Sequence, residues 1–158
     1  MTASRHCVVA GFDGSAASRA ALSLAVEHAR PDGRVVVVHA FTPPAGAYGG
    51  ANYQKVLDAA LGHAQGLLAN LADEVPGLGS LDWTTEVLAG PAAIALVNVA
   101  DVEHASEIVI GTRGFGRARA LLGSVAHDLI HRARCPVTVI PKRALDATDE
   151  ERLVATAG

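Results

Sequence analysis

The chain has 158 residues, half of them hydrophobic but only 4% aromatic, with a formal net charge of −3 and a pI of about 6.1. This length favours one domain with a core of Val, Ala, Leu and Ile, and the charge gives no overall field that would attract nucleic acid or an acidic membrane. Cys7 and Cys135 have neither disulfide-framework nor zinc-site spacing, and the N-terminus lacks the pattern of a signal peptide. No apolar run approaches the roughly 18 residues of a membrane span, so we expect a cytoplasmic protein without nucleic-acid or membrane partners.

Short apolar runs alternate with stretches of helical periodicity along the chain. In chain order the pattern predicts a strand at 7–12, a helix at 16–30, a strand at 34–41, an irregular Gly- and Pro-rich segment at 42–52, a helix at about 53–75, a strand at 81–88, a helix from 90–91 to about 105, a strand at 107–111, a helix at 124–134 and a strand at 135–141. Ser15 is the expected N-cap of the first helix.

This alternation predicts an α/β fold with right-handed crossovers between parallel strands. We expect a Rossmann-like three-layer sandwich, of the adenine nucleotide alpha hydrolase-like type, with a five-stranded, mainly parallel sheet and four helices. Residues 1–141 would form the domain and residues 142–158 a polar C-terminal tail. Such sheets bind ligands at the carboxyl ends of their strands, where the strand order reverses.

The segment GTRGFGRARALLGS, residues 111–124, follows the fourth predicted strand directly. Its glycines either allow a surface loop to turn or expose backbone N–H groups to an anion. Gly123 and Ser124 stand where the fourth helix should begin, and the N-terminus of a helix is a natural anion site. The segment is not a P-loop, because no GK[ST] follows its glycines, and a dinucleotide fingerprint would follow the first strand instead.

A second unusual turn, FDGS, follows the first predicted strand and contains Asp13. By itself this Asp is better explained as a turn residue. If the first strand is central, flanked by the second and the fourth, the crevice at the switch point receives the ends of the first and fourth strands. We therefore expect Asp13 and the glycine-rich segment to lie on opposite sides of one cleft.

These motifs resemble those of the universal stress protein family, in particular UspA-like domains of the ATP-binding type. Members that bind ATP carry G-x2-G-x9-G-[ST] after the fourth strand, and this chain is similar, with Gly111, Gly114, Gly123 and Ser124. VVAGFDGSAASRAAL and LLGSVAHDLIHRARCPVTVIP also resemble the family, so the resemblance extends from residue 7 to residue 141. One departure is that eight residues, not nine, separate Gly114 from Gly123.

The resemblance implies a site for ATP or another adenine nucleotide, which Mg²⁺ could accompany. It implies that Asp13 contacts the ribose or lies near the adenine and that backbone groups of Ala40 read the adenine edge, while Ile110 could flank the base. The phosphates would be held by residues of the glycine-rich segment and of the helix start, namely Gly111, Gly114, Gly123, Ser124 and Val125.

The last predicted strand, bracketed by Pro136 and Pro141, has the character of an edge strand, and an apolar edge invites pairing with a second copy. The resemblance likewise implies a homodimer through this strand, acting as a stress-response or signalling module. The alternatives are the same fold acting through protein contacts without a nucleotide, and a nucleotide-dependent enzyme.

No convincing catalytic residues are present in the sequence. HDLIH, residues 127–131, imitates a zinc-protease signature, but both histidines fall on the polar face of the predicted helix, so no metal site is expected. LGSVA lacks the final glycine of a nucleophile elbow. We expect at most slow ATP hydrolysis or self-phosphorylation, with Ser124 and Thr112 as the nearest hydroxyls.

Overall fold

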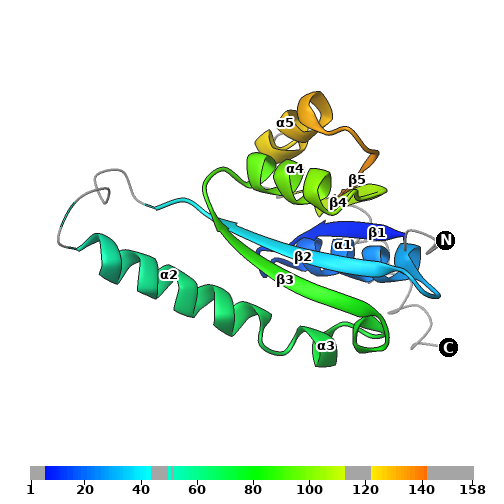
Figure 1. The fold of residues 1–158 in the computed structure, drawn as a ribbon, viewed down its shortest axis with the longest axis horizontal. Helices are drawn as coiled ribbons and strands as arrows, with labels where there is room; N and C mark the ends of the chain where they lie inside the picture. The colour runs from blue at the N-terminus through cyan, green and yellow to red at the C-terminus, as the bar shows by residue number, and fades with distance from the viewer. Residues whose placement is uncertain (1–5, 44–49, 51, 113–121, 142–158) are drawn as a thin grey trace, which may run out of the picture.

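The structure is a computed structural model that describes residues 6–43, 50, 52–112 and 122–141. Its elements, labelled in Figure 1, are β1 (Cys7–Gly11), α1 (Ala16–Ala29), β2 (Arg34–Phe41), α2 (Tyr53–Leu68), α3 (Leu71–Glu74), the 3-10 turn η1 (Leu78–Ser80), β3 (Asp82–Ala89), α4 (Ala92–Val102), β4 (Glu107–Gly111), α5 (Ser124–Arg132) and β5 (Val137–Ile140).

The five strands form one parallel sheet in the order β3-β2-β1-β4-β5. β1 is central, with Gly11 opposite Val38 of β2 and Ala10 opposite Val109 of β4. The strand order therefore reverses at β1, and the ends of β1 and β4 are neighbours. The predicted fold class and the predicted position of the switch point are confirmed.

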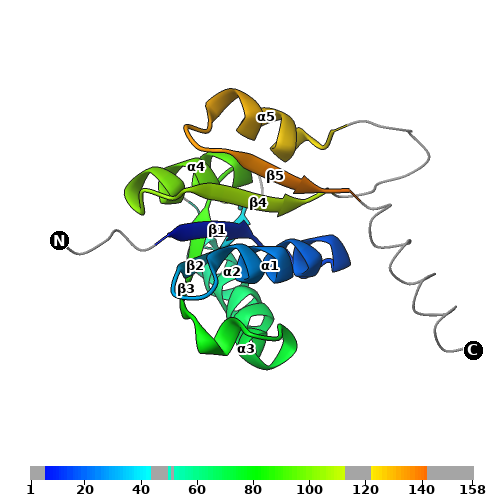
Figure 2. The ribbon, with the colours of Figure 1, turned by 90° about the vertical axis from the view of Figure 1, so that its right-hand side faces the viewer.

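Helices cover both faces of the sheet, as the side view in Figure 2 shows. Alternate residues of each strand point to opposite faces. Val35 and Val37 of β2 join a core cluster with α1, and Val36 and Val38 join a second cluster with α4 and α5. β1, β2 and β4 are buried on both faces, which explains why their sequences are mostly apolar, whereas the outer strands β3 and β5 are only partly buried.

The helices follow the predicted periodicity with one interruption. Ser15 caps α1 as expected, its side chain accepting a hydrogen bond from the backbone N–H of Ser18. The helix predicted over 53–75 ends at Leu68, and α3 begins again after Asn70. Asn competes for backbone hydrogen bonds and favours turns, so the break falls where helix propensity is weak, while Leu68, Leu71 and Val75 still reach the core.

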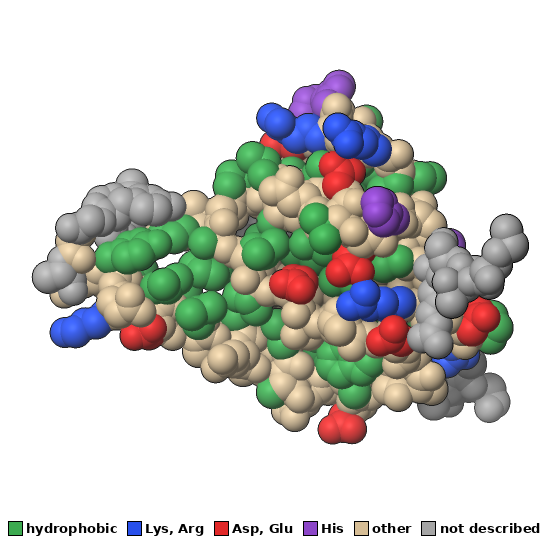
Figure 3. All heavy atoms as spheres, viewed as in Figure 1, with side chains coloured by type: hydrophobic (Ala, Val, Ile, Leu, Met, Phe, Trp, Pro, Cys, Tyr) green, Lys and Arg blue, Asp and Glu red, His purple; other side chains and the backbone are tan. Residues whose placement is uncertain are grey.

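The surface carries both signs of charge. On the face seen in Figure 3, basic and acidic side chains are interspersed, and hydrophobic side chains gather along α2. None of the helices in the described ranges combines the length and the apolar character needed to cross a bilayer.

Candidate functional site

A cavity of about 370 Å³ opens where the carboxyl ends of β1, β2 and β4 meet the start of α1, α4 and α5. Its volume lies within the range of roughly 300–1,000 Å³ that is typical of small-molecule sites. Of the eight residues predicted from the sequence to bind a nucleotide, seven line this cavity: Asp13, Ala40, Ile110, Gly111, Gly123, Ser124 and Val125. The eighth, Gly114, lies outside the described residues.

The turn after β1 is ordered by side-chain hydrogen bonds. Asp13 Oδ1 accepts from the backbone N–H of Ser15 at 3.0 Å, which closes the turn over Gly14. The Ser18 hydroxyl donates to the Ser15 carbonyl at 3.0 Å and lies 3.3 Å from the Asp13 nitrogen. Gly14 has φ +83°, a left-handed backbone conformation that residues with a side chain rarely adopt. The turn thus places a carboxylate at one wall of the cavity.

Another part of the cavity wall is formed by the start of α5. Its N-cap is Gly123, which has no side chain to make a capping hydrogen bond, in contrast to α1 with its Ser15 cap. The N-terminus of a helix carries partial positive charge on N–H groups that have no partner within the helix. Ser124 adds a hydroxyl, and it is exposed at the cavity. This wall is suited to an anion such as a phosphate.

Two glycines of the predicted motif differ in whether packing requires the absence of a side chain. A Cβ atom on Gly111 would lie 2.4 Å from the backbone of Ala17, so this position must lack a side chain for α1 to pack against β4. A Cβ atom on Gly123 would meet nothing within 4 Å. Packing within the described residues therefore explains Gly111 but not Gly123, where a side chain would enter space beside the cavity.

Sequence reasoning missed part of the lining. Ala92 and Leu96 of α4 reach the cavity, as do residues at or near the predicted turns and strand ends, namely Gly11, Phe12, Ser15, Ser18, Val38, Thr42 and Ala126. Thr112, expected as a nearby hydroxyl, also lines it. Positions beside a motif could have been included on adjacency alone. Ala92 and Leu96 carried no such signal, because their helix follows a plain Gly-Pro start and only the tertiary fold brings it to the strand ends.

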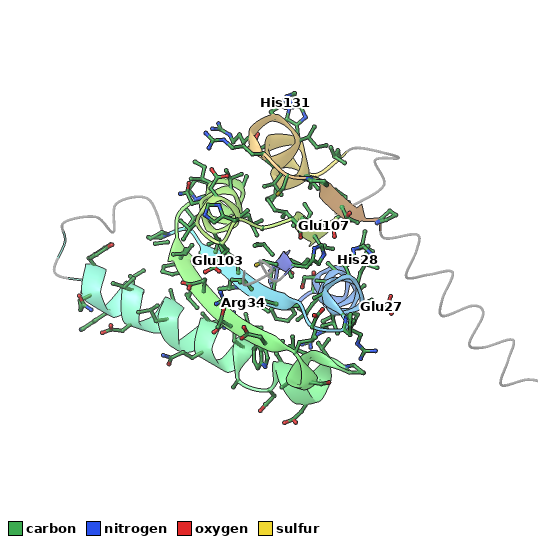
Figure 4. All side chains as sticks on the ribbon, turned by 45° about the vertical axis from the view of Figure 1, so that its right-hand side comes forward. Glu27, His28, Arg34, Glu103, Glu107 and His131 are labelled. Atoms are coloured by element: carbon green, nitrogen blue, oxygen red, sulfur yellow. The ribbon has the colours of Figure 1, made fainter. Side chains whose placement is uncertain are left out.

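Other polar clusters lie at the opposite, amino ends of the strands, as Figure 4 shows. His28 Nδ1 of α1 is 2.7 Å from Glu107 Oε2 at the start of β4, and Arg34 Nη1 at the start of β2 is 2.6 Å from Glu103 Oε2. Arg34 also donates to Thr84 Oγ1 at 3.1 Å. These pairs connect neighbouring elements at a distance from the cavity. The bond to Glu107 gives His28 a structural role.

The two histidines of HDLIH lie on exposed positions of α5, with His131 pointing outward in Figure 4. Their ring centroids are 4.7 Å apart. Among the described residues no group of three or more His, Cys, Asp or Glu side chains is arranged to hold a metal ion.

Known proteins are similar to this chain in sequence and in fold. A universal stress protein of Thermus aquaticus is 32% identical over 135 residues, which cover 84% of this chain and 96% of that protein. The structure of UspA from Lactobacillus plantarum matches with a TM-score of 0.72 at 23% identity, covering 88% of this chain and 99% of its own. The universal stress protein from Archaeoglobus fulgidus in complex with dAMP matches with a TM-score of 0.54 at 27% identity, covering 85% and 96%.

The sequence model of the universal stress protein family matches residues 5–141. This span includes all the strands and helices described above, together with the FDGS turn and the glycine-rich segment. The chain belongs to the universal stress protein family.

Proposed function

We propose that this protein binds an adenine nucleotide in the cavity at the strand ends, with ATP as the first candidate, and acts as a dimeric stress-response or signalling module. The observation that carries the proposal is that one cavity is lined both by Asp13 and by the start of α5, whose N-cap, Gly123, has no capping side chain. A nucleotide has the matching chemistry, with ribose hydroxyls as donors and phosphates as acceptors.

Each part of the nucleotide has a suitable wall. The base would lie between the apolar side chains of Ile110 and Leu96, with backbone groups of Ala40 at its edge. Asp13 would accept from ribose hydroxyls, and Gly123, Ser124 and Val125 would hold the phosphates through backbone N–H groups and one hydroxyl. Gly111 and Gly114 belong to the same proposed phosphate segment. Mg²⁺ would accompany a triphosphate, because this ion is typically held by phosphates together with one or two carboxylates.

A relative supports the ligand class. The Archaeoglobus fulgidus protein, 27% identical over most of both chains, was solved with dAMP. An adenine nucleotide fits a site in which backbone groups, rather than a specific side chain, would read the base. The cytoplasmic location stays a prediction, as does the division into a domain and a tail.

Titration with ATP, AMP, cyclic AMP and GTP, read by thermal denaturation and calorimetry, tests the proposal. A ligand at 100 times its dissociation constant should add about 2.7 kcal/mol to the free energy of unfolding. Stabilisation by adenine nucleotides above GTP is the expected result. If no nucleotide stabilises the protein, the alternative of a scaffold that acts through protein contacts replaces this proposal. Sustained turnover of ATP would instead indicate an enzyme.

Two variants of Asp13 separate its structural and binding roles. Asp13→Asn keeps an oxygen that can accept from the Ser15 N–H but loses the charge, so stability should change little. Asp13→Ala should also lose that hydrogen bond, at a cost of about 0.5–1.5 kcal/mol. Both should weaken nucleotide binding, since a hydrogen bond to a charged group contributes about 1.5–3 kcal/mol. Unchanged affinity in Asp13→Asn would remove the carboxylate from the proposed site.

The dimer is proposed to form through β5, the edge strand of the sheet beside β4. All four of its residues are only partly buried. Val137 and Val139 pack against the core on one face of the sheet, and the outer edge of the strand has no neighbouring strand within the described sheet. A second copy paired along this edge would complete the backbone hydrogen bonding there.

A further inference from the structure

His39 lies in β2 between two residues of the cavity wall, yet its side chain is on the other side of the strand. Val38 and Ala40 line the cavity, whereas His39 shares the face of Val35 and Val37, which pack in the core with α1. The residue is only 8% exposed. A buried polar ring must have a hydrogen-bond partner, and here that partner belongs to the turn that carries Asp13.

The partner is the carbonyl of Phe12, the residue directly before Asp13. His39 Nδ1 is 2.9 Å from this oxygen. A carbonyl oxygen only accepts, so Nδ1 carries the proton and donates. The backbone N–H of Phe12 in turn donates to the Val38 carbonyl at 2.9 Å. Phe12 is therefore held to β2 through both its backbone N–H and its carbonyl, one residue beyond Gly11, the last residue of β1.

The imidazole also replaces a backbone bond. In a continued parallel ladder, the next bond would run from the Ala40 N–H to the Phe12 carbonyl. Among the described residues this bond is not made, and His39 donates to the Phe12 carbonyl instead. Ala40 has the same orientation in the strand as Val38, so its N–H points past the end of β1, where the cavity lies.

We infer that His39 is a positioning residue of the nucleotide site, an inference that rests on the proposed function. It fixes the turn that presents Asp13 through the Phe12 carbonyl, and the Ala40 N–H, which is not bonded to that carbonyl among the described residues, remains available to the edge of the base. A side chain behind the wall thus sets two of the contacts made in front of it.

Three substitutions distinguish the position of the donor from the bulk of the ring. Asn places its amide nitrogen where Nδ1 of His stands, whereas Gln places it one bond farther along the side chain. Leu has similar volume and no donor. We expect His39→Asn to bind ATP and AMP within about threefold of the wild type, and His39→Gln and His39→Leu to bind at least about fivefold more weakly, as expected for a lost hydrogen bond of about 1 kcal/mol.

Amide hydrogen exchange without nucleotide gives an independent readout. In His39→Leu the Phe12 carbonyl is free to accept from Ala40, so the Ala40 amide should exchange more slowly than in the wild type, while the Asp13 amide should exchange faster. His39→Asn should keep the wild-type pattern. A purely structural role would lower the stability of all three variants without this reversal at Ala40.

The outcomes are distinct. If the wild type binds nucleotide and His39→Leu and His39→Gln bind equally well, the inference is wrong and the proposed function stands. If affinity falls in His39→Asn as much as in His39→Leu, in parallel with stability, His39 is a core residue only. If the wild type binds no nucleotide, the proposed function fails and this inference fails with it. Should His39→Leu not fold, the comparison of Asn with Gln decides.

Discussion

The end of β4 lies directly against the backbone of α1, because a Cβ atom on Gly111 would stand 2.4 Å from the carbonyl carbon of Ala17 and 2.5 Å from its oxygen. Contacts this short with backbone atoms cannot be relieved by turning a flexible side chain. The same helix begins at the turn that carries Asp13. The close approach of β4 and α1 therefore sets the distance between two walls of the cavity, and it depends on one missing methyl group.

Replacing Gly111 with Ala should destabilise the fold. The added methyl overpacks the contact with Ala17, and overpacking typically costs about 1–3 kcal/mol. Urea denaturation measures the change. Gly62→Ala is the matched control, because Gly62 lies in α2 and an added methyl group there would meet nothing within 4 Å, so Ala should add up to about 1 kcal/mol of stability. Equal stability of Gly111→Ala and the wild type would contradict the packing argument.

Gly123→Leu, unlike Gly111→Ala, should leave stability nearly unchanged and should abolish nucleotide binding. The backbone at this N-cap has φ −58° and ψ 157°, which any residue adopts, and an added Cβ atom would meet nothing within 4 Å. Reduced entropy of the unfolded chain favours the variant, and the preference of N-caps for Gly over Leu opposes it, so stability should stay within about 1 kcal/mol. Nucleotide binding, measured by calorimetry, should be lost. Binding that survives this bulk would move the phosphate site away from α5.

The cysteines should make stability depend on pH only in the alkaline range. Burial, with smaller contributions from Glu103 and Asp82, raises the pKa of Cys7 above its ordinary value of 9.0, although Arg34 opposes the shift. Burial, followed by Asp101, raises the pKa of Cys135 in the same direction. The unfolded chain therefore releases these protons first, so stability is full below pH 9.0 and falls as the pH rises through the folded-state pKa values.

Denaturation between pH 7 and 10 checks this slope, and Cys7→Ala, Cys135→Ala and the double variant identify its source. Iodoacetamide labelling adds a second measurement. Cys135 is partly exposed and should react as the pH approaches its pKa, whereas the buried Cys7 should react only on unfolding. Rapid labelling of Cys7 in the folded protein at neutral pH would show that the burial and the pKa direction are wrong.

The proposed dimer can be tested at one backbone position. Carbonyls of Pro136 and Ile140 accept from β4, at 2.9 Å from the nitrogens of Ile108 and Thr112. Residues of the other parity, Val137 and Val139, direct their backbone groups to the open edge. Val139→Pro removes an edge-facing N–H and leaves the pairing with β4, so the variant should be monomeric by sedimentation while its circular dichroism stays that of the wild type.

Hydrogen exchange supplies the control for that variant. In a wild-type dimer paired through β5, the amides of Val137 and Val139 should be protected, and the protection should decrease on dilution. A monomeric wild type, or a Val139→Pro variant that remains dimeric, would exclude this edge as the interface.

Much of the fold could be predicted because its signals are local. Largely apolar runs such as residues 34–41 and 107–111 match their strands at both ends, since the middle of a strand buried on both faces must be mostly apolar. The cleft was predictable on one condition, that β1 is central and flanked by β2 and β4, and the observed strand order meets that condition. The break at Asn70 was not predictable, because the apolar periodicity continues through it and only the weak helix propensity of Asn marks the site.

The sequence by itself determined the class of fold, because hydrophobic periodicity acts over short distances in the chain, and its family resemblance indicated seven of the described residues that line the cavity. Only the tertiary structure decided which contacts these residues make. It shows that Gly111 packs against Ala17, that Leu96 lines the cavity, and that His39 lies behind the cavity wall, bonded to the Phe12 carbonyl. These relations join segments that are distant in the chain, and packing between such segments leaves no periodic trace in the sequence.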